Sequence, residues 1–120
     1  MPPMAEQVVL DLQPLEDVYG DDRAGIVELV EMVVGEEADA LAPLRAAVES
    51  HDLGALRDAA HGIKGAAANV GALAVSHAAL AIEARARAGE WSDVFGLLHE
   101  LDLAVVSART ELARYRTGNV

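Results

Sequence analysis

The chain places a nucleophile, a cation and a position without a side chain within four residues of one another: His61, Lys64 and Gly65. On an α-helix, residues three and four apart lie on the same face, so Lys64 and Gly65 would share the face of His61. Arg57 and Ala68 extend this face by one turn and two turns in opposite directions. An exposed imidazole is mostly unprotonated at neutral pH and can attack phosphorus. Neighbouring cations would offset charge on the transferred oxygens, so this face could carry phosphoryl transfer.

Two glycines stand inside the same predicted helix, where each costs about 1 kcal/mol relative to alanine. For Gly62, tight helix packing or simple tolerance is a sufficient reason. Gly65 lies on the outward face beside His61, where it leaves open space and bare backbone. We therefore predict that another surface approaches closely at Gly65.

The overall charge of the chain excludes several kinds of partner. It has 9 basic and 20 acidic residues, a net charge of −11 with neutral histidines. Proteins that bind nucleic acid display basic patches, and anionic membrane surfaces also attract basic patches. We therefore expect neither nucleic acid nor an anionic membrane as a partner. Most of the acidity is expected to serve solubility. The chain has one lysine, Lys64, and its place three residues after His61 is a local exception.

Length and composition predict one domain in a reducing compartment. The 120 residues contain no cysteine, which excludes disulfides, zinc–thiolate sites and a cysteine nucleophile. The N-terminus lacks a signal-peptide pattern, and every apolar run is far shorter than a membrane span. We expect a soluble, cytoplasmic protein with a flexible N-terminus (1–7), a single domain (8–116) and a frayed tail (117–120).

The sequence indicates an all-α fold. Hydrophobic residues make up 52% of the chain but aromatic residues only 3%, and no segment alternates with the period of a strand. Apolar spacing predicts helices over about 8–19, 23–50, 53–70, 73–88 and from 91–92 to the tail. Asp52 would cap the third helix and Gly71 would end it. Pro14 is expected to break or bend the first helix. Gly35 and Pro43 interrupt the second, which we predict to be one long helix with a bend; two helices end to end is the alternative.

Long amphipathic helices with short connections predict an antiparallel up-and-down four-helix bundle with a short extra N-terminal helix. In the third helix, one apolar stripe must face the core. Its members are Leu53, Leu56, Ala60, Ile63, Ala67 and Val70. Because His61 lies roughly opposite Ile63 on the helix, we expect its side chain to be exposed.

The segment 61–71 reads His-Gly-Ile-Lys-Gly-Ala-Ala-Ala-Asn-Val-Gly. It resembles the active-site helix of histidine-containing phosphotransfer (HPt) domains, whose pattern is a histidine, two variable residues, Lys-Gly, small residues and a closing glycine. The resemblance extends over roughly residues 8–115. Four further segments are similar to the layout of the family: Gly20-Asp21-Asp22, His51-Asp52, Ile82-Glu83 and Gly89-Glu90-Trp91.

The resemblance implies that His61 accepts a phosphoryl group from the aspartyl phosphate of a response-regulator receiver domain and passes it to another receiver. One of these receivers could belong to a hybrid histidine kinase. The resemblance further implies that Lys64 supports the phosphoryl oxygens and that Gly65 admits the loops of the partner. It also implies that the chain is a monomer. The Mg²⁺ used in transfer would belong to the receiver, so no cofactor is expected on this chain. No glycine-rich phosphate loop is present, which predicts a phosphoryl carrier and not an ATP-dependent kinase.

The family also suggests where the partner docks. Its N-terminal helix and the exposed part of its second helix form part of the docking surface, which predicts roles for Leu12, Leu15 and Ile26 beside Gly65, Ala68 and Arg57. The chain departs from the family at four positions. Ala66 stands where serine is common, Gly62 where a larger residue is common, and Val33 and Val34 where phenylalanine is common.

A phosphoryl carrier has two alternatives. An HPt-like module could dock a receiver or kinase without carrying phosphate, but it would need neither His61 nor Lys64. The dimerisation domain of a histidine kinase would need a proline shortly after the histidine and a downstream ATP-binding domain.

The remaining polar residues are expected to lie on the solvated surface. This applies to the three histidines outside the motif, and to two arginines that could also add positive field near the partner: His51, His77, His99, Arg85 and Arg87. No glutamate stands three residues before any histidine, as the paired motifs of a di-metal bundle require, so no metal site is predicted.

Overall fold

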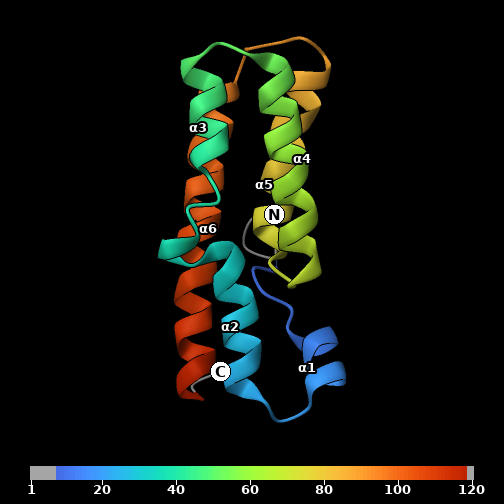
Figure 1. Ribbon diagram of the computed structural model, residues 1–120, viewed down its shortest axis with the longest axis vertical. Helices are drawn as coiled ribbons and strands as arrows, with labels where there is room; N and C mark the ends of the chain where they lie inside the picture. The colour runs from blue at the N-terminus through green and yellow to red at the C-terminus, as the bar shows by residue number, and fades with distance from the viewer. Residues whose placement is uncertain (1–7, 119–120) are drawn as a thin grey trace, which may run out of the picture.

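A computed structural model describes residues 8–118, and within that range it contains helices and no strand (Figure 1). The helices are α1 (Gln13–Tyr19), α2 (Arg23–Val34), the 3₁₀-helix η2 (Glu36–Ala38), α3 (Ala42–Glu49), α4 (Leu53–Asn69), α5 (Leu73–Arg87) and α6 (Val94–Thr117). The all-α prediction is confirmed. The predicted flexible segment 1–7 and the last two residues of the predicted tail lie outside the described residues.

The bundle has four members, one of which is broken into two helices. Figure 1 shows α2 and α3 end to end alongside the long α6, with α4 packed beside α3, and α5 packed against α4 and α6. The prediction of one bent helix over residues 23–50 is therefore wrong, and the alternative of two helices end to end is right. Gly35 leaves α2 in an extended conformation, and Pro43 lies in the first turn of α3. The Arg109 guanidinium donates through Nε to the Val34 carbonyl at 2.6 Å, which satisfies a backbone acceptor that the break leaves open.

The N-terminal helix is shorter than predicted. Residues 8–12 are irregular, and α1 begins at Gln13 with Pro14 in its first turn. Proline at this place lacks an N–H that the helix would leave unpaired anyway, so it starts the helix and does not break it. The Asp11 backbone N–H donates to the Gly71 carbonyl at 2.8 Å, so the irregular segment is tied to the turn between α4 and α5.

The other helix ends follow from their caps. The Asp52 carboxylate accepts from the Ala55 N–H at 3.0 Å, which confirms the predicted N-cap of α4. The last helix begins at Val94, slightly later than predicted. Thr117 is still helical, and Gly118 ends α6 in a left-handed conformation, so the predicted frayed tail starts too early.

Small side chains form much of the core between α4 and α5. Ala60, Ala67 and Ala79 are completely buried, which lets the two antiparallel helices approach closely. The predicted core stripe of α4 is confirmed, with Leu53 partly buried and its other members buried. None of the described helices is long and apolar enough to cross a membrane.

We expect Gly71→Ala to destabilise the fold more than Gly89→Ala. Both glycines have left-handed backbone angles (φ +76° and +75°), so both substitutions carry a strain of about 1 kcal/mol. A Cβ at Gly71 would lie 2.0 Å from the Asp11 carbonyl oxygen, whereas one at Gly89 meets nothing within 4 Å. The overlap should add about 1–3 kcal/mol to the loss of unfolding free energy, measured in urea. Equal losses in the two variants would show that the Asp11–Gly71 contact does not constrain the fold.

Candidate functional site

His61 lies in the middle of α4 and reaches across to α5. Its side chain is 62% exposed, and its Nδ1 lies 2.9 Å from Oε2 of Glu83. The Glu83 side chain, by contrast, is only 3% exposed. The closing turn after Asn69 returns α5 along α4, which places the two side chains together although they are 22 residues apart. The predicted exposure of His61 is thus confirmed, and its Nδ1 is held by the buried Glu83 carboxylate.

The Glu83 carboxylate gathers two cations in addition to His61. Lys64 Nζ lies 2.8 Å from Oε1, and Arg87 donates to Oε2 through Nη2 at 2.8 Å and Nε at 3.2 Å. A buried carboxylate is costly to desolvate unless it is paired, and this one is paired on both oxygens. Glu83 therefore fixes the positions of the exposed His61 imidazole and of two cations.

The carboxylate also selects the tautomer of His61. An ionised carboxylate only accepts hydrogen bonds, so the hydrogen-bond network assigns the ring proton to Nδ1, which donates to Glu83. In the neutral ring this leaves the lone pair on Nε2. An imidazole oriented in this way, on a largely exposed side chain, can act as a nucleophile through Nε2.

The ionised state of Glu83 is strongly stabilised. The hydrogen bonds from Lys64 and then Arg87 lower the pKa of the Glu83 carboxyl from 4.5 to about 2, against the opposing effect of burial. The hydrogen bond from His61 makes a smaller contribution to the same lowering of the pKa. Glu83 thus stays a hydrogen-bond acceptor for His61 throughout the neutral range.

We expect the contribution of Glu83 to folding stability to disappear in acid. Because its pKa is lower in the folded state, this contribution is complete above pH 4.5 and is lost as the pH falls towards 2. The difference in unfolding free energy between the wild type and Glu83→Gln should therefore shrink from pH 6 to pH 3. Urea unfolding at several pH values measures it, with Glu90→Gln as the control for loss of an exposed carboxylate. A pH-independent difference would contradict the paired state of Glu83.

The structure places the predicted motif residues in different surroundings. Lys64 joins the cluster, with 30% of its side chain exposed. Gly65 and Ala68 are exposed, and a Cβ added at Gly65 would meet nothing within 4 Å. Arg57 pairs with its neighbour Asp58 at 3.2 Å and makes no contact with the His61 cluster among those described. The second cation of the cluster is Arg87, not Arg57.

One predicted docking residue is wrong. Ile26 is 0% exposed, because it lies on the stripe of α2 that also contains Val30 and Val34 and faces the core. Leu12 and Leu15 are partly buried and pack against that core. No further observation tests their predicted docking role.

Sequence reasoning missed the role of Glu83 and assigned Arg87 mainly to the solvated surface. A signal was present, since Ala79, Glu83 and Ala86 follow helical spacing along a stripe that is otherwise apolar. A single acid on such a stripe must be paired when it is buried. Ser76 was also missed; its hydroxyl donates to the Lys64 carbonyl at 3.0 Å and joins α5 to α4 next to the site.

Within residues 8–118 no group of three or more His, Cys, Asp or Glu side chains could hold a metal ion. The chemistry of the cluster is that of an oriented imidazole with cations beside it, and none of its members requires a metal for its position.

Comparison with known proteins gives two matches. The Hpt domain family matches residues 28–111, which include His61 and all its partners in the cluster. The fold is similar to the crystal structure of histidine-containing phosphotransfer protein B (HptB) from Pseudomonas aeruginosa PAO1, with a TM-score of 0.78. The two chains are 28% identical, over 91% of this chain and 95% of the other. No curated protein gave a match. The family match, over most of the chain, shows that this protein belongs to the Hpt domain family.

Proposed function

We propose that His61 is the residue that carries the phosphoryl group in the histidine phosphotransfer that Hpt domains perform in phosphorelays. The observation that carries this proposal is the hydrogen bond from His61 Nδ1 to the buried Glu83 carboxylate at 2.9 Å. It orients an exposed imidazole and leaves the lone pair on Nε2. Incubation with a phosphorylated receiver domain, with and without His61, tests it as described in the Discussion.

The transfer step follows from this geometry. The Nε2 lone pair attacks the phosphorus of an aspartyl phosphate on the receiver, and a new N–P bond forms. The bond between phosphorus and the aspartate oxygen breaks, and the electron pair leaves with the receiver carboxylate. The phosphorylated ring retains the proton on Nδ1 and becomes positively charged, and Glu83 stabilises this charge. Transfer to a second receiver is the same step in reverse.

Lys64 supplies positive charge beside the reacting nitrogen. It stands one turn from His61 and is held by Glu83 at 2.8 Å, so its ammonium is fixed before a phosphoryl group arrives. We propose that it offsets charge on the phosphoryl oxygens. Arg87 balances the same carboxylate from the other side, since it also pairs with Glu83.

Hpt domains interact with response-regulator receiver domains in phosphorelays. For this chain we propose a receiver as both donor and acceptor, one of which could belong to a hybrid histidine kinase. The Mg²⁺ used in transfer is proposed to belong to the receiver. We further propose that the chain acts as a monomer in the cytoplasm, and that it relays phosphate without drawing it from ATP.

We expect a large side chain at Gly65 to weaken receiver docking and leave folding intact. A Cβ at Gly65 meets no atom within 4 Å, and leucine is a better helix former than glycine, so Gly65→Leu should not destabilise α4. The added side chain would occupy surface that the receiver must approach, which should raise the Kd at least about tenfold. Gly96, in α6, also has open space around it, so Gly96→Leu is the matched control. Unchanged receiver binding in Gly65→Leu would exclude this glycine from the docking surface.

The alternative, a docking module that carries no phosphate, differs in one observable. Such a module would bind a receiver whether or not residue 61 is histidine, and it would never become labelled. The oriented and exposed His61 favours the carrier over this alternative.

A further inference from the structure

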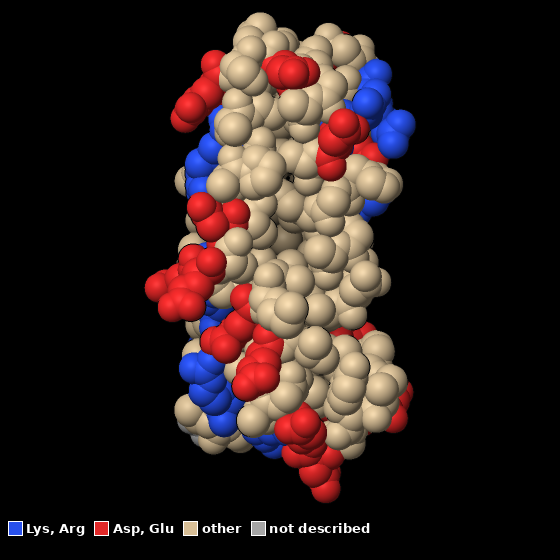
Figure 2. All heavy atoms as spheres, viewed as in Figure 1, with Lys and Arg blue, Asp and Glu red and all other residues tan. Residues whose placement is uncertain are grey.

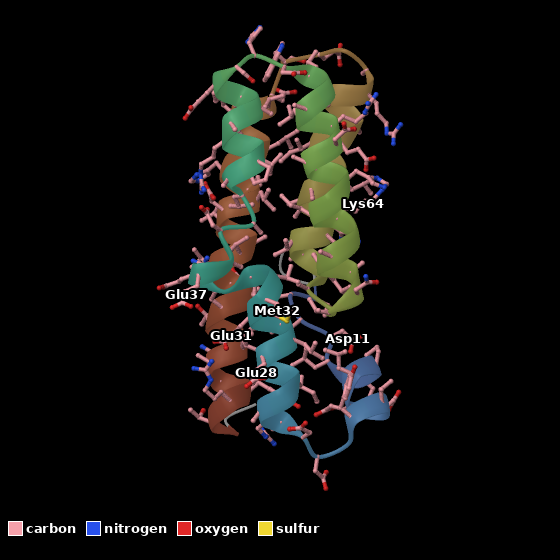
Figure 3. The ribbon with its side chains drawn as sticks, in the orientation of Figure 1. Asp11, Glu28, Glu31, Met32, Glu37 and Lys64 are labelled. Carbon is pink, nitrogen blue, oxygen red and sulfur yellow. The ribbon has the colours of Figure 1, made fainter. Side chains whose placement is uncertain are left out.

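A groove lies between α2, η2 and the C-terminal half of α6. Its volume is about 900 Å³, and it is open to solvent. Figure 3 shows Glu28, Glu31, Met32 and Glu37 on α2 and η2, whereas Lys64 lies on α4 on the other side of the view. The groove contains none of the residues of the His61 cluster.

Acidic side chains outnumber basic side chains in the lining of the groove. Its glutamates and arginines are Glu28, Glu31, Glu36, Glu37, Arg109 and Arg116. Figure 2 shows the red acidic side chains gathered over this part of the molecule, with blue side chains beside them.

Both arginines already have partners. Arg109 donates to the backbone carbonyls of Val34 and Gly35, and Arg116 pairs with Glu31. The other three glutamates make no ion pair within residues 8–118. The groove therefore presents uncompensated negative charge to whatever enters it.

The wall of the groove also presents an apolar anchor point. Met32 is 74% exposed, which makes it the most exposed large hydrophobic side chain in the described part of the chain. Met32 lies one turn after Glu28 on α2, and Glu36 follows beyond the break at Gly35. Leu112 and Ala113 of α6 also line the groove. Methionine is flexible and polarisable, and it is used often at surfaces that accept apolar side chains of partners. An exposed methionine among charged side chains therefore offers an apolar contact to a partner.

We propose that this groove docks a basic amphipathic helix of a partner protein. An apolar residue of that helix would pack on Met32, and lysines or arginines on either side would pair with Glu28 and with Glu36 or Glu37. Glu28 lies on α2 and Glu36 and Glu37 lie on η2, so a partner helix that carries cations at two positions can pair with both elements. A second copy of this chain is disfavoured as the occupant because each copy carries a net charge of −11.

The test uses a fluorescein-labelled synthetic helical peptide of about 18 residues, with a central leucine stripe flanked by lysines one turn away on each side. Fluorescence anisotropy measures its Kd for the full chain in 50 and 300 mM NaCl. We expect Glu28→Gln/Glu37→Gln to raise the Kd at least about fivefold, Met32→Ser about threefold, and the higher salt to weaken binding. All three positions are exposed, so the variants should keep the wild-type helicity, which circular dichroism checks.

The matched control is Glu49→Gln/Glu100→Gln, which removes the same number of charges from exposed positions outside the groove. It should change the Kd by less than about twofold. A peptide of the same composition in scrambled order should bind at least about fivefold more weakly. Equal effects of the two double variants, equal binding of the scrambled peptide, or no binding at 1 mM protein would each overturn the proposal. Phosphotransfer at His61 is not measured in this experiment, so its outcome is independent of the proposed relay function.

Discussion

His61→Ala is expected to abolish phosphoryl labelling of the chain and to leave its helices intact. The imidazole is the group that we propose attacks phosphorus, and alanine supplies no nucleophile in its place. The His61 side chain is 62% exposed, so its removal opens no cavity in the core, and alanine is a strong helix former. Incubation with a receiver domain that carries radioactive phosphate, followed by gel analysis, measures the label. Circular dichroism measures the helicity.

The control for this variant is His99→Ala, which removes another exposed histidine from a helix, α6. It should become labelled as the wild type does. Label on the His61→Ala variant at the wild-type level would contradict the assignment of the carrier residue. Receiver binding without label in the wild type would favour the docking-module alternative.

Glu83→Ala is expected to slow phosphoryl transfer at least about tenfold without weakening receiver docking. The carboxylate holds the proton of His61 on Nδ1 and keeps Lys64 beside it, and alanine removes both effects. A ring free to rotate and to exchange tautomers would present its Nε2 lone pair in the right direction for only part of the time. Glu83 is buried, so it acts on the reaction as a positioning residue through His61 and Lys64.

Two measurements separate this role from a purely structural one. In single-turnover transfer from a phosphorylated receiver, the rate at saturating receiver should fall while the half-saturating concentration stays unchanged. Glu83→Gln should keep more of the rate than Glu83→Ala, because the amide oxygen can still accept from Nδ1. Glu90→Ala, which removes an exposed glutamate paired with Arg85, should transfer at the wild-type rate. A loss seen only in the half-saturating concentration would contradict the positioning role.

Much of the fold follows from local signals in the sequence. Asp52 and Gly71 bound α4 as predicted, because capping depends on residues within the same turn. The sequence predicts one bent helix near Gly35 because the apolar period runs through the break. The break is stabilised by Arg109, which lies 74 residues later in the chain. A proline such as Pro14 can break a helix or occupy its first turn. The hydrogen bond from Asp11 to Gly71 holds the preceding residues outside the helix, so Pro14 lies in the first turn of α1.

Only the site residues that lie together on α4 could be predicted from the sequence. His61, Lys64 and Gly65 are related by helical spacing alone, so the sequence places them on one face. Glu83 and Arg87 enter from α5, and their contact with His61 depends on the register between α4 and α5, which the alanine-rich core sets. Arg57 has the same helical spacing but pairs with Asp58. Helical periodicity does not predict this pairing, because it depends on side-chain geometry. Ile26 illustrates the same limit, since its exposure depends on which neighbours cover α2.

The most direct test of the account is the position of the phosphoryl group on the wild-type chain. Nuclear magnetic resonance of the phosphorylated protein, with ¹⁵N-labelled histidine, identifies which ring nitrogen of which histidine is bonded to phosphorus. Because Nδ1 of His61 is occupied by its hydrogen bond to Glu83, we predict an N–P bond at Nε2 of His61. Phosphate on Nδ1 of His61, or on His51, His77 or His99, would contradict the mechanism.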